Sequence, residues 1–535
     1  MESFDYIIVG SGAAGAVIAS RLTEDENVKV LLLEAGGPDH HPLQNMPMAF
    51  PKVIANSNYN WRFESEPERA LNGRKVPTPR GRTLGGSTEI NAGIAIRGNP
   101  RDYDIWREAG LEGWGYADVL PYFRRLESHW RGATKLHGGD GPVRITRMAA
   151  PALLFEPLVE AASALQIPLN DDPNGAAQDG LCQMEATIDR GRRASTSNAY
   201  LRPARRRPNL AIRTNALATR VVMEEKRAVG IAYRHGGQET QSRAKREVIL
   251  AAGSFGSPQL LLLSGIGPGA HLREFGIPQI HDLPGVGENL GEHPNILNIY
   301  KTHTETGMTR YLRFDRATVQ VLRWLFFRDG PFATNGATAN FFLRSLPGLD
   351  RPDVQLTPHT ITGVANLWFP LLTAAPLHCF EIRIGVLHPR SRGSVRLRSR
   401  DPADKPRITY NLFQAQEDID AMVRAINLCR RVYATKPLSD MIEQELAPGS
   451  AVTSEADLAD YIRANCGHRS HPVGTCKMGV DEMAVVDGQL RVRGLEGLRV
   501  ADASVMPETP SGNTNLPTMM IGEKAADLIR GRLLV

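Results

Sequence analysis

Cysteine and aromatic residues are scarce in this sequence, and each shortage excludes a class of protein. The 535 residues include five cysteines, which are unclustered and form neither a zinc-binding spacing nor a CxxC pair. We therefore expect free thiols in a reducing compartment and no metal site. Aromatic residues make up 6% of the chain and do not alternate with the arginines of its densest basic stretch, residues 190–208. That stretch predicts a solvated basic face, with contact to an acidic membrane surface as the alternative, and gives no support for nucleic-acid binding.

Long apolar runs are absent as well. No run reaches the roughly 18 residues that a membrane-spanning helix needs. The first residues, MES, lead directly into an apolar strand pattern, which leaves no room for a signal peptide. We therefore expect a cytoplasmic protein, with peripheral membrane attachment left open. At 535 residues the chain is also too long for one hydrophobic core, so two or more domains are expected.

What the N-terminal part does contain is a strand, a glycine-rich turn and a helix in close succession. The apolar run 6–9 is typical of a strand in a parallel sheet, and Gly10-x-Gly12-x-x-Gly15 and a helical stretch to residue 22 follow it. A second apolar strand, 28–33, ends in Glu34. The glycines allow a tight turn and a close approach to a pyrophosphate, and Glu34 would accept hydrogen bonds from a ribose. We predict a dinucleotide site here; the alternative is a glycine-rich turn without a ligand.

The remaining chain predicts a discontinuous nucleotide domain and a second domain. Residues 36–80 are rich in proline, asparagine and glycine and predict a surface excursion of the kind that covers active sites. Apolar strands near 247–254 and 498–502 return to the N-terminal pattern, whereas 296–470 alternates like an antiparallel sheet. We predict an α/β Rossmann-like domain and an α+β domain with a mainly antiparallel sheet. The first comprises residues 1–150, 200–295 and 475–535, and the second comprises 151–199 and 296–474.

Four separated stretches resemble signatures of the glucose–methanol–choline oxidoreductases, a family that uses FAD. They are the Gly10–Gly15 turn with Glu34, GGSTEIN at 85–91, the run 253–267, and the C-terminal pair HPVGTCKMG at 471–479 and DASVMP to NTN at 502–515. The resemblance extends from residue 4 to the end of the chain. Within the family the chain looks closest to bacterial alcohol and choline dehydrogenases, polyethylene glycol dehydrogenases and hydroxymethylfurfural oxidases.

The resemblance implies two catalytic side chains. His471 would take the hydroxyl proton of an alcohol, a task that suits a histidine because its pKa lies near neutrality. Asn515 would hold the alkoxide, and the helix that begins near Pro517 would direct its positive end toward the flavin. The alternatives are a buried His471 satisfied by backbone groups and an Asn515 that only caps the helix.

The resemblance also implies the FAD-binding residues and a cofactor that is not covalently attached. Covalent members of the family link the flavin to a histidine just before the signature asparagine, and Ile90 occupies that position here. The residues predicted to bind FAD are Gly10, Ser11, Gly12, Ala13, Ala14, Gly15, Glu34, Ala35, Gly85, Ser87, Asn91, Ala92, Gly93, Val221, Ala252, Gly253, Asp502, Ala503 and Asn515.

Three positions depart from the family pattern. Glu89 and Gly291 replace a small and a polar residue, respectively. Arg469 stands two residues before His471, where an uncharged residue is usual. A cation there would favour an anionic substrate or alter oxygen reactivity, or else it would point to solvent. We interpret His293 as structural.

We predict oxidation of a primary alcohol to an aldehyde, with hydride transfer to FAD and electrons passed on to a non-oxygen acceptor such as a quinone or a cytochrome. One alternative is an oxidase that uses oxygen and makes hydrogen peroxide. An alternative from another class is a flavin-binding protein without turnover. The substrate would be a small or polymeric alcohol. A choline site would need a carboxylate and aromatic rings, for which Trp324, Phe326, Phe327, Trp368 and Phe369 are candidates, although such residues more often belong to a core.

Overall fold

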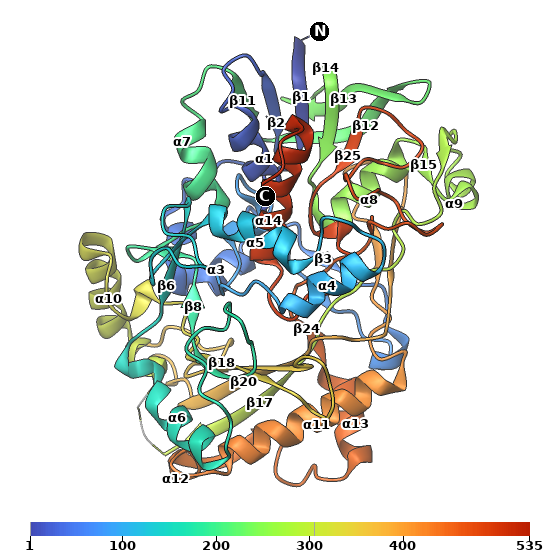
Figure 1. The fold of residues 1–535 in the computed structure, drawn as a ribbon. Coiled ribbons are helices and arrows are strands. Elements are labelled where there is room, and N and C mark those ends of the chain that lie inside the picture. Colours follow the sequence, from blue (N-terminus) through green and yellow to red (C-terminus); the bar gives the residue numbers. More distant parts are fainter. Residues whose placement is uncertain (1, 304, 306, 535) are drawn as a thin grey trace.

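Two seven-stranded sheets organise the chain (Figure 1), and the computed structural model describes residues 2–303, 305 and 307–534. The first sheet has the order β11-β2-β1-β14-β13-β12, with β25 beside β14. Its strands are β1 (Glu2–Val9), β2 (Val30–Leu33), β11 (Leu210–Arg213), β12 (Ala216–Glu224), β13 (Arg227–His235), β14 (Gln238–Leu250) and β25 (Leu498–Val500). Three distant parts of the chain therefore build one sheet.

The centre of this sheet is parallel and completely buried, as the apolar runs predict. β1 runs parallel to β2 and β14, and β14 runs parallel to β25. Helices α1 (Gly15–Leu22) and α14 (Asn515–Arg530) pack side by side along it, with α5 (Tyr116–Leu126) next to α14 (Figure 1). Gly522 permits this packing, because a Cβ atom there would lie 2.9 Å from the carbonyl oxygen of Ala14. The first sheet is thus the Rossmann-like layer expected from the sequence.

Helix α14 begins two residues earlier than predicted. We expected its start near Pro517, and it starts at Asn515. Proline fits the first turn of a helix because the first backbone N–H groups have no intrahelical acceptor. The earlier start places Asn515 inside the helix and leaves Asn513 in the segment before it.

The second sheet is antiparallel throughout, which confirms that part of the predicted fold. Its order is β23-β17-β20-β19-β18-β7, with β24 beside β17. Its strands are β7 (Gly180–Gln183), β17 (Pro294–Thr302), β18 (Ala339–Leu343), β19 (Val354–His359), β20 (Cys379–Val386), β23 (Ile442–Ala447) and β24 (Gly467–His468). Helices α11 (Gln416–Tyr433) and α13 (Glu455–Asn465) lie beneath this sheet in Figure 1, on the side away from the first sheet.

The chain passes between the two sheets more than once, since β7 belongs to the second sheet and β11 to β14 belong to the first. The predicted domain limits follow the same alternation, and their bounds stay a prediction. The other helices are α2 (Pro42–Asn45), α3 (Phe50–Ala55), α4 (Pro100–Glu108), α6 (Phe155–Ala164), α7 (Arg202–Ala204), α8 (Gly253–Leu263), α9 (Gly269–Glu274), α10 (Phe314–Phe327) and α12 (Leu438–Met441). Smaller strands are β3 (Phe63–Glu64), β4 (Pro77–Thr78), β5 (Glu127–His129), β6 (Val143–Arg147), β8 (Glu185–Ala186), β9 (Ile188–Asp189), β10 (Arg192–Arg193), β15 (Ile266–Gly267), β16 (His281–Asp282), β21 (Ser394–Arg396) and β22 (Arg407–Thr409).

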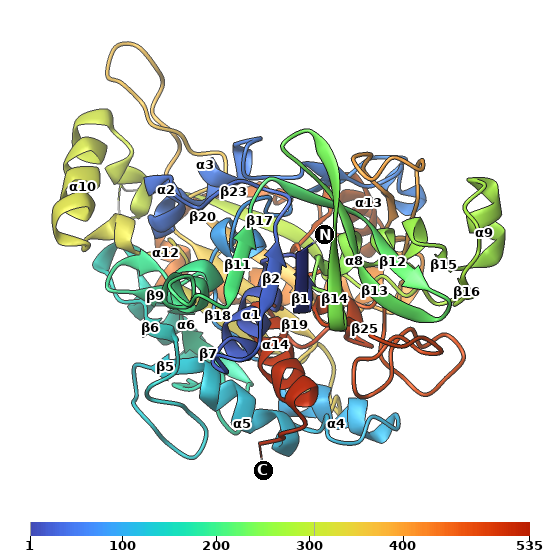
Figure 2. The same ribbon diagram turned by 90° about the horizontal axis from the view of Figure 1, so that it is seen from above.

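One edge of the molecule carries exposed apolar side chains. Helix α10 and the loop 362–378 project on the same side (Figure 2), and the rings of Phe314 and Phe369 stack between them at 4.5 Å. Among the described residues, no helix is both long enough and apolar enough to cross a membrane. The five cysteines are buried free thiols, as the sequence predicts.

Candidate active site

A cavity of about 620 Å³ lies between the two sheets. The carboxyl ends of β1 and β2 border it through Val9 and Leu33, and the second sheet borders it through Asn295, Thr357 and Arg383. The excursion 36–80 closes part of it with Phe50, Trp61 and Pro79, among other residues, as the sequence predicts for a cover. Ligand sites of α/β sheets lie at the carboxyl ends of their strands, so the location itself marks a candidate site.

The glycines of the first turn have separate tasks. A Cβ atom at Gly10 would lie 2.4 Å from the carbonyl oxygen of Ala251, and one at Gly15 would lie 1.9 Å from that of Gly10. Neither position accepts a side chain, so these two glycines let the turn and helix α1 pack closely. Gly12 differs, because no atom lies within 4 Å of its would-be Cβ, and it lines the cavity. Its open side is where a ligand can approach the backbone.

Glu34 holds the glycine turn in place. Its carboxylate accepts from the backbone N–H of Ser11 at 3.1 Å, from the Ser11 hydroxyl at 2.7 Å, and from the backbone N–H of Gly36 at 2.8 Å. Only 6% of Glu34 is exposed. Burial raises the pKa of its carboxyl group even though these hydrogen bonds oppose the shift. A carboxylate has about four acceptor positions, so Glu34 retains capacity for a ribose hydroxyl.

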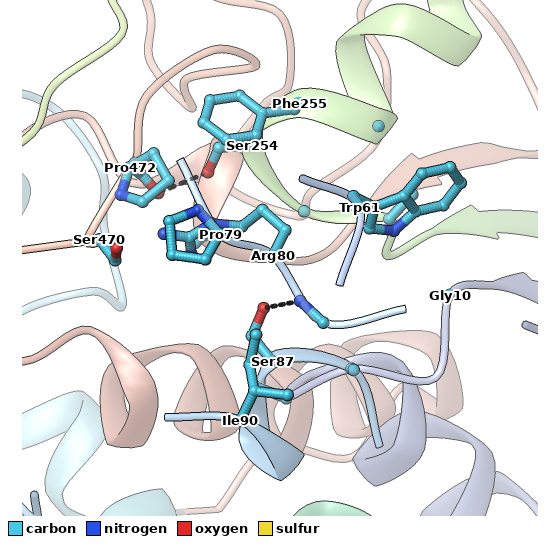
Figure 3. A pocket seen from close by; sticks show the side chains of 18 of the residues that line it. Gly10, Trp61, Pro79, Arg80, Ser87, Ile90, Ser254, Phe255, Ser470 and Pro472 are labelled. Carbon is cyan, nitrogen blue, oxygen red and sulfur yellow. Dashed lines mark hydrogen bonds between the residues drawn. The ribbon is translucent and has the colours of Figure 1, made fainter. Parts of the chain in front are cut away.

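Asp502 holds a second turn in place, the one at the start of helix α8. Its Oδ2 accepts from the backbone N–H of Gly253 at 2.8 Å and from the Ser257 hydroxyl at 2.6 Å, which ties β25 to the start of α8. Next in α8, the Ser254 hydroxyl donates to the carbonyl oxygen of Pro472 at 2.6 Å (Figure 3). The helix start, β25 and the segment that carries His471 therefore form one hydrogen-bonded unit.

His471 lies at the cavity end formed by the second sheet, between His293 and Asn513. Its Nδ1 is 2.9 Å from Nδ1 of His293, and its Nε2 is 3.0 Å from Nδ2 of Asn513. An amide Nδ2 can only donate, so Nε2 of His471 is the accepting nitrogen. The neutral ring then carries its proton on Nδ1 and donates it to His293. His293, interpreted from the sequence as structural, thereby sets the orientation of the ring.

Burial and nearby positive charge keep the His471 ring neutral. Desolvation lowers its pKa well below the ordinary value, and His293 and Arg469 lower it further. The backbone N–H of His471 donates to both carboxylate oxygens of Glu292 at 2.8 Å. The pKa of Glu292 is itself raised to about 8 by burial. The result is a rigid, neutral imidazole whose accepting nitrogen faces the cavity.

Asn513 was not among the residues predicted from the sequence to act. It contacts His471, and its Oδ1 lies 3.5 Å from Nε2 of Gln355. Asn515 is the first residue of α14 and lines the cavity, and its Nδ2 is a buried amide nitrogen without a hydrogen-bond partner among the described residues. The motif Asn513-Thr-Asn515 contains both residues, and only the helix start shows which one faces the histidine. The catalytic role of Asn515 remains a prediction.

Most of the other predicted residues line this one cavity. They are Gly10, Gly12, Ala13, Ala14, Glu34, Ala35, Ser87, Asn91, Ala92, Gly93, Ala252, Gly253, Asp502 and Ala503. In the view of Figure 3, Ser87 and Ile90 lie below Pro79 and Arg80, and Ser254 and Pro472 lie above them. Ser11, Gly15 and Gly85 lie behind this surface, where the Ser11 hydroxyl donates to Glu34 and accepts from the backbone N–H of Gly85.

Two sets of predicted residues lie elsewhere. Val221 is buried in β12 and donates its N–H to Ser264, and Ala216 to Ala218 of the same strand line the cavity instead. The five aromatic residues considered for an ammonium site do not line it either: Trp324 is buried against Gly191, and Phe326 and Phe327 are 75% exposed. The aromatic rings at the cavity are those of Phe50, Trp61, Phe63 and Phe255.

Comparisons with known proteins identify the family and relatives of the whole chain. The N-terminal and C-terminal family models described as GMC oxidoreductase match residues 4–295 and 389–522. The chain is 44% identical to an oxygen-dependent choline dehydrogenase of Klebsiella pneumoniae, over 99% of this chain and 96% of the relative. It is 42% identical to one of Brucella anthropi over the same shares.

Solved structures extend the likeness to the whole fold. A formate oxidase variant of Aspergillus oryzae superposes with a TM-score of 0.93 at 29% identity, covering 99% of this chain and 98% of the other. A pyridoxine 4-oxidase, attributed to Mesorbium loti, superposes with a TM-score of 0.87 at 29% identity, covering 98% of each chain.

Proposed function

The chain belongs to the GMC oxidoreductase family, and from that premise we propose that His471 and Asn513 are the two side chains that act on its alcohol substrate. The protein is an FAD-dependent oxidoreductase of CH–OH donors, as the sequence predicts. When bound, FAD supplies the acceptor for the hydride that leaves the alcohol carbon. The remaining chemistry belongs to residues of this chain.

The cavity residues fit FAD. Gly12 leaves its backbone open at the N-terminal side of α1, where an anionic pyrophosphate is favoured. Glu34 lies at the end of β2, where a ribose would meet it. At the opposite end, Asn515 offers a buried and unpartnered amide at the start of α14. A helix N-terminus and an amide donor both suit the electron-rich part of a flavin ring.

The observation that carries the proposal is the contact between Nε2 of His471 and Nδ2 of Asn513, 3.0 Å apart. A substrate hydroxyl that approaches both atoms from the cavity would accept from Asn513 and donate to His471. The ring then takes the hydroxyl proton at Nε2, while the carbon loses a hydride and the alcohol becomes an aldehyde. Asn513 cannot take a proton, so it stabilises the developing oxyanion without competing as a base.

The acceptor of the electrons has two candidates. A non-oxygen acceptor such as a quinone or a cytochrome is the proposal made from the sequence. Oxygen is the second candidate, because the two relatives are named oxygen-dependent and the two structural neighbours are oxidases. Steady-state turnover with and without oxygen, with peroxide measured against reduction of a soluble quinone, decides between them.

Peripheral contact with a membrane is a further part of the proposal. It is supported by exposed apolar side chains on α10 and the loop 362–378: Val319, Phe326, Phe327, Leu371 and Leu372 are each between 58% and 105% exposed. Arg313, Arg316, Arg323 and Arg328 lie on or next to the same helix. Apolar and basic residues on one helix are typical of surfaces that meet anionic lipids. The cytoplasmic location stays a prediction.

Anaerobic mixing of the FAD-loaded protein with a panel of primary alcohols tests the proposed function. We expect at least one alcohol to bleach the flavin absorbance and to yield one aldehyde per flavin. A protein that stays yellow with every alcohol would be a flavin-binding protein without turnover, which is the alternative from another class.

A further inference from the structure

The cavity end next to His471 is lined by cations and by no acid, while Glu292 and Glu381 lie behind its surface, against His471 and Arg383. The second sheet and the segment before His471 line it with Asn295, Thr357, His359, Arg383 and Arg469. The acids that line the cavity are Glu34, Asp404 and Asp502. Glu34 and Asp502 are occupied by the two turns described above, and Asp404 lies in the loop between β21 and β22. Arg80 adds a further cation opposite Ser87 (Figure 3).

Arg469 is a half-buried cation that forms no ion pair with a carboxylate of the described residues, and the acid that acts on its charge is the buried Glu292. Its Nη2 donates to the Thr357 hydroxyl at 2.7 Å, and its Nη1 contacts the carbonyl oxygens of Gln355 and Arg383 at 3.3 and 3.4 Å. No carboxylate of the described residues lies within ion-pair distance of its guanidinium. Burial and the neighbouring Arg383 lower its pKa to about 9, which still leaves it charged at neutral pH. Its three acceptors are neutral oxygens, so an anion that enters the cavity would add the charged hydrogen bond that the guanidinium lacks.

The fold makes room for this arginine. Gly385 of β20 has no side chain, and a Cβ atom there would lie 2.6 Å from Cδ of Arg469. The stem of Arg469 therefore lies directly on the backbone of β20, and its head group reaches Thr357 on β19. Arg469 therefore points into the cavity. The alternative interpretation of the sequence, in which Arg469 points to solvent, does not hold.

Arg383 stands beside it on the same face of the sheet. Thr357 is its cross-strand partner, and two residues along each strand Gly385 pairs with Gln355. Arg383 donates to Glu381 at 3.2 Å, yet 38% of its side chain remains exposed. Arg383 is thus a second cation at this end. Glu381 binds part of its guanidinium, and the side chain also lines the cavity.

These residues connect to the proposed catalytic pair. Thr357 and Gln355 both donate to Oδ1 of Asn340, at 3.0 and 2.9 Å, and Nε2 of Gln355 is also 3.5 Å from Oδ1 of Asn513. The sheet that fixes Arg469 therefore also fixes Asn513. A substrate anchored at Arg469 would be anchored to the same rigid support as the group that holds its hydroxyl.

From this arrangement we propose that the cavity end formed by Arg469 and Arg383 is a subsite for a carboxylate, and that the substrate is a hydroxy acid whose primary hydroxyl meets His471. The proposal rests on the proposed function and specifies its substrate class. A planar carboxylate matches a guanidinium better than other anions of the same charge. A quaternary ammonium such as choline would instead face two cations and no acid, so this chain differs in substrate from the relatives named for choline.

Matched substrates test the proposal. The FAD-loaded protein is mixed anaerobically with 4-hydroxybutyrate, 6-hydroxyhexanoate and 4-(hydroxymethyl)benzoate, each paired with its neutral diol or methyl analogue, and with choline. We expect the second-order rate of flavin reduction to favour at least one hydroxy acid over its neutral partner by about 100-fold. Arg469→Gln should lower the ratio of the hydroxy-acid rate to the neutral-partner rate by a factor of about 10 to 100, the contribution of a charged hydrogen bond. The ratio is the readout because Arg469 also acts on His471, so both absolute rates can change. Arg469→Lys should restore part of the preference.

A second measurement does not depend on turnover. Calorimetric binding of hexanoate and benzoate, which lack the hydroxyl, should weaken at least tenfold in Arg469→Gln and in Arg383→Gln. Arg344→Gln serves as the control, since Arg344 is exposed and pairs with Asp179 on the surface. If Arg469→Gln does not hold FAD, Arg383→Gln takes its place in both experiments.

Equal or lower rates for every hydroxy acid than for its neutral partner would overturn the proposal, as would carboxylate binding that the arginine variants leave unchanged. Failure of the proposed function is distinct from either result. In that case no alcohol, neutral or charged, bleaches the flavin, and carboxylate binding alone decides whether the subsite exists.

Discussion

Nδ2 of Asn513 lies 3.0 Å from Nε2 of His471, in the one orientation that leaves the imidazole nitrogen as the acceptor. The pair explains how a histidine and an amide divide the work on one hydroxyl group. It also replaces the pairing of His471 with Asn515 that the sequence motif favours, and the two versions make different predictions.

Asn513→Ala should slow anaerobic flavin reduction by about 100-fold, because it removes a donor aimed at the developing oxyanion. Asn515→Ala should affect the rate less and FAD affinity more, since its amide nitrogen lies at the start of α14 and has no hydrogen-bond partner among residues 2–303, 305 and 307–534. Flavin reduction rates and FAD dissociation constants, measured for both variants, check this. Equal rate losses in the two variants would return the catalytic role to Asn515.

The pH dependence of flavin reduction should follow His471. Its pKa is lowered by burial and by the nearby His293 and Arg469, so the ring is neutral at pH 7 and is protonated only in more acidic solution than a free imidazole. A neutral ring is the active base, so the rate should stay on its plateau through about pH 6.5, the ordinary histidine value, and fall only in more acidic solution. His471→Ala should lose about 100-fold in rate together with this acidic limb. An acidic limb that persists in the variant would place the base at another residue.

Glu34→Ala should weaken FAD binding by about 1–3 kcal/mol, the usual cost of a lost charged hydrogen bond. The loss has two sources, since Glu34 faces the cavity and also holds Ser11 and Gly36 in the first turn. Fluorescence titration of the flavin-free protein gives the dissociation constant. Glu26→Ala, at an exposed position after α1, is the matched control. An unchanged affinity in Glu34→Ala would remove this residue from the nucleotide site.

FAD should come off the protein when the chain is denatured. Ile90 lines the cavity at the position where covalent members of the family carry a histidine, and an aliphatic side chain forms no flavin bond. Acid precipitation should leave a colourless pellet and a yellow supernatant. Yellow colour retained in the pellet would indicate a covalent link at another side chain.

Loss of apolar side chains on α10 should weaken membrane contact. Replacing Phe326 and Phe327 with serine removes two rings that are 75% exposed, and each buried ring contributes about 1.5–3 kcal/mol. The fraction bound to phosphatidylglycerol vesicles should fall at least tenfold in a flotation assay, while alcohol oxidation is unchanged. Leu169→Ser, at another exposed apolar position, is the control. Equal flotation of all three proteins would exclude this surface.

The parts of the site that the sequence predicts are those fixed by local pattern. Gly10, Gly12 and Glu34 follow from strand, turn and helix spacing, because a βαβ unit leaves little freedom in where these residues lie. Val221 does not line the cavity, whereas Ala216 to Ala218 at the start of β12 do, and an alternating pattern does not specify which end of a strand meets a cavity.

The contacts across the cavity could not be predicted in this way. Asn513 and Asn515 are two residues apart, and only the start of α14 decides which one faces His471. Arg469 is an ordinary charged residue in the sequence. Its burial depends on Gly385, 84 residues earlier on another strand, which is a property of packing and not of local pattern.

The first sheet is assembled from strands that lie far apart in the sequence, and this has a consequence for the synthesis of the protein. β1 and α1 are made first, but α14, which packs against α1, and β25, which completes the sheet beside β14, are among the last elements to leave the ribosome. Asp502 and Asn515 arrive with them, so the FAD site stays incomplete until translation ends. Tight capture of the cofactor must then wait for the finished chain, and release of the nascent protein and loading of flavin become successive events.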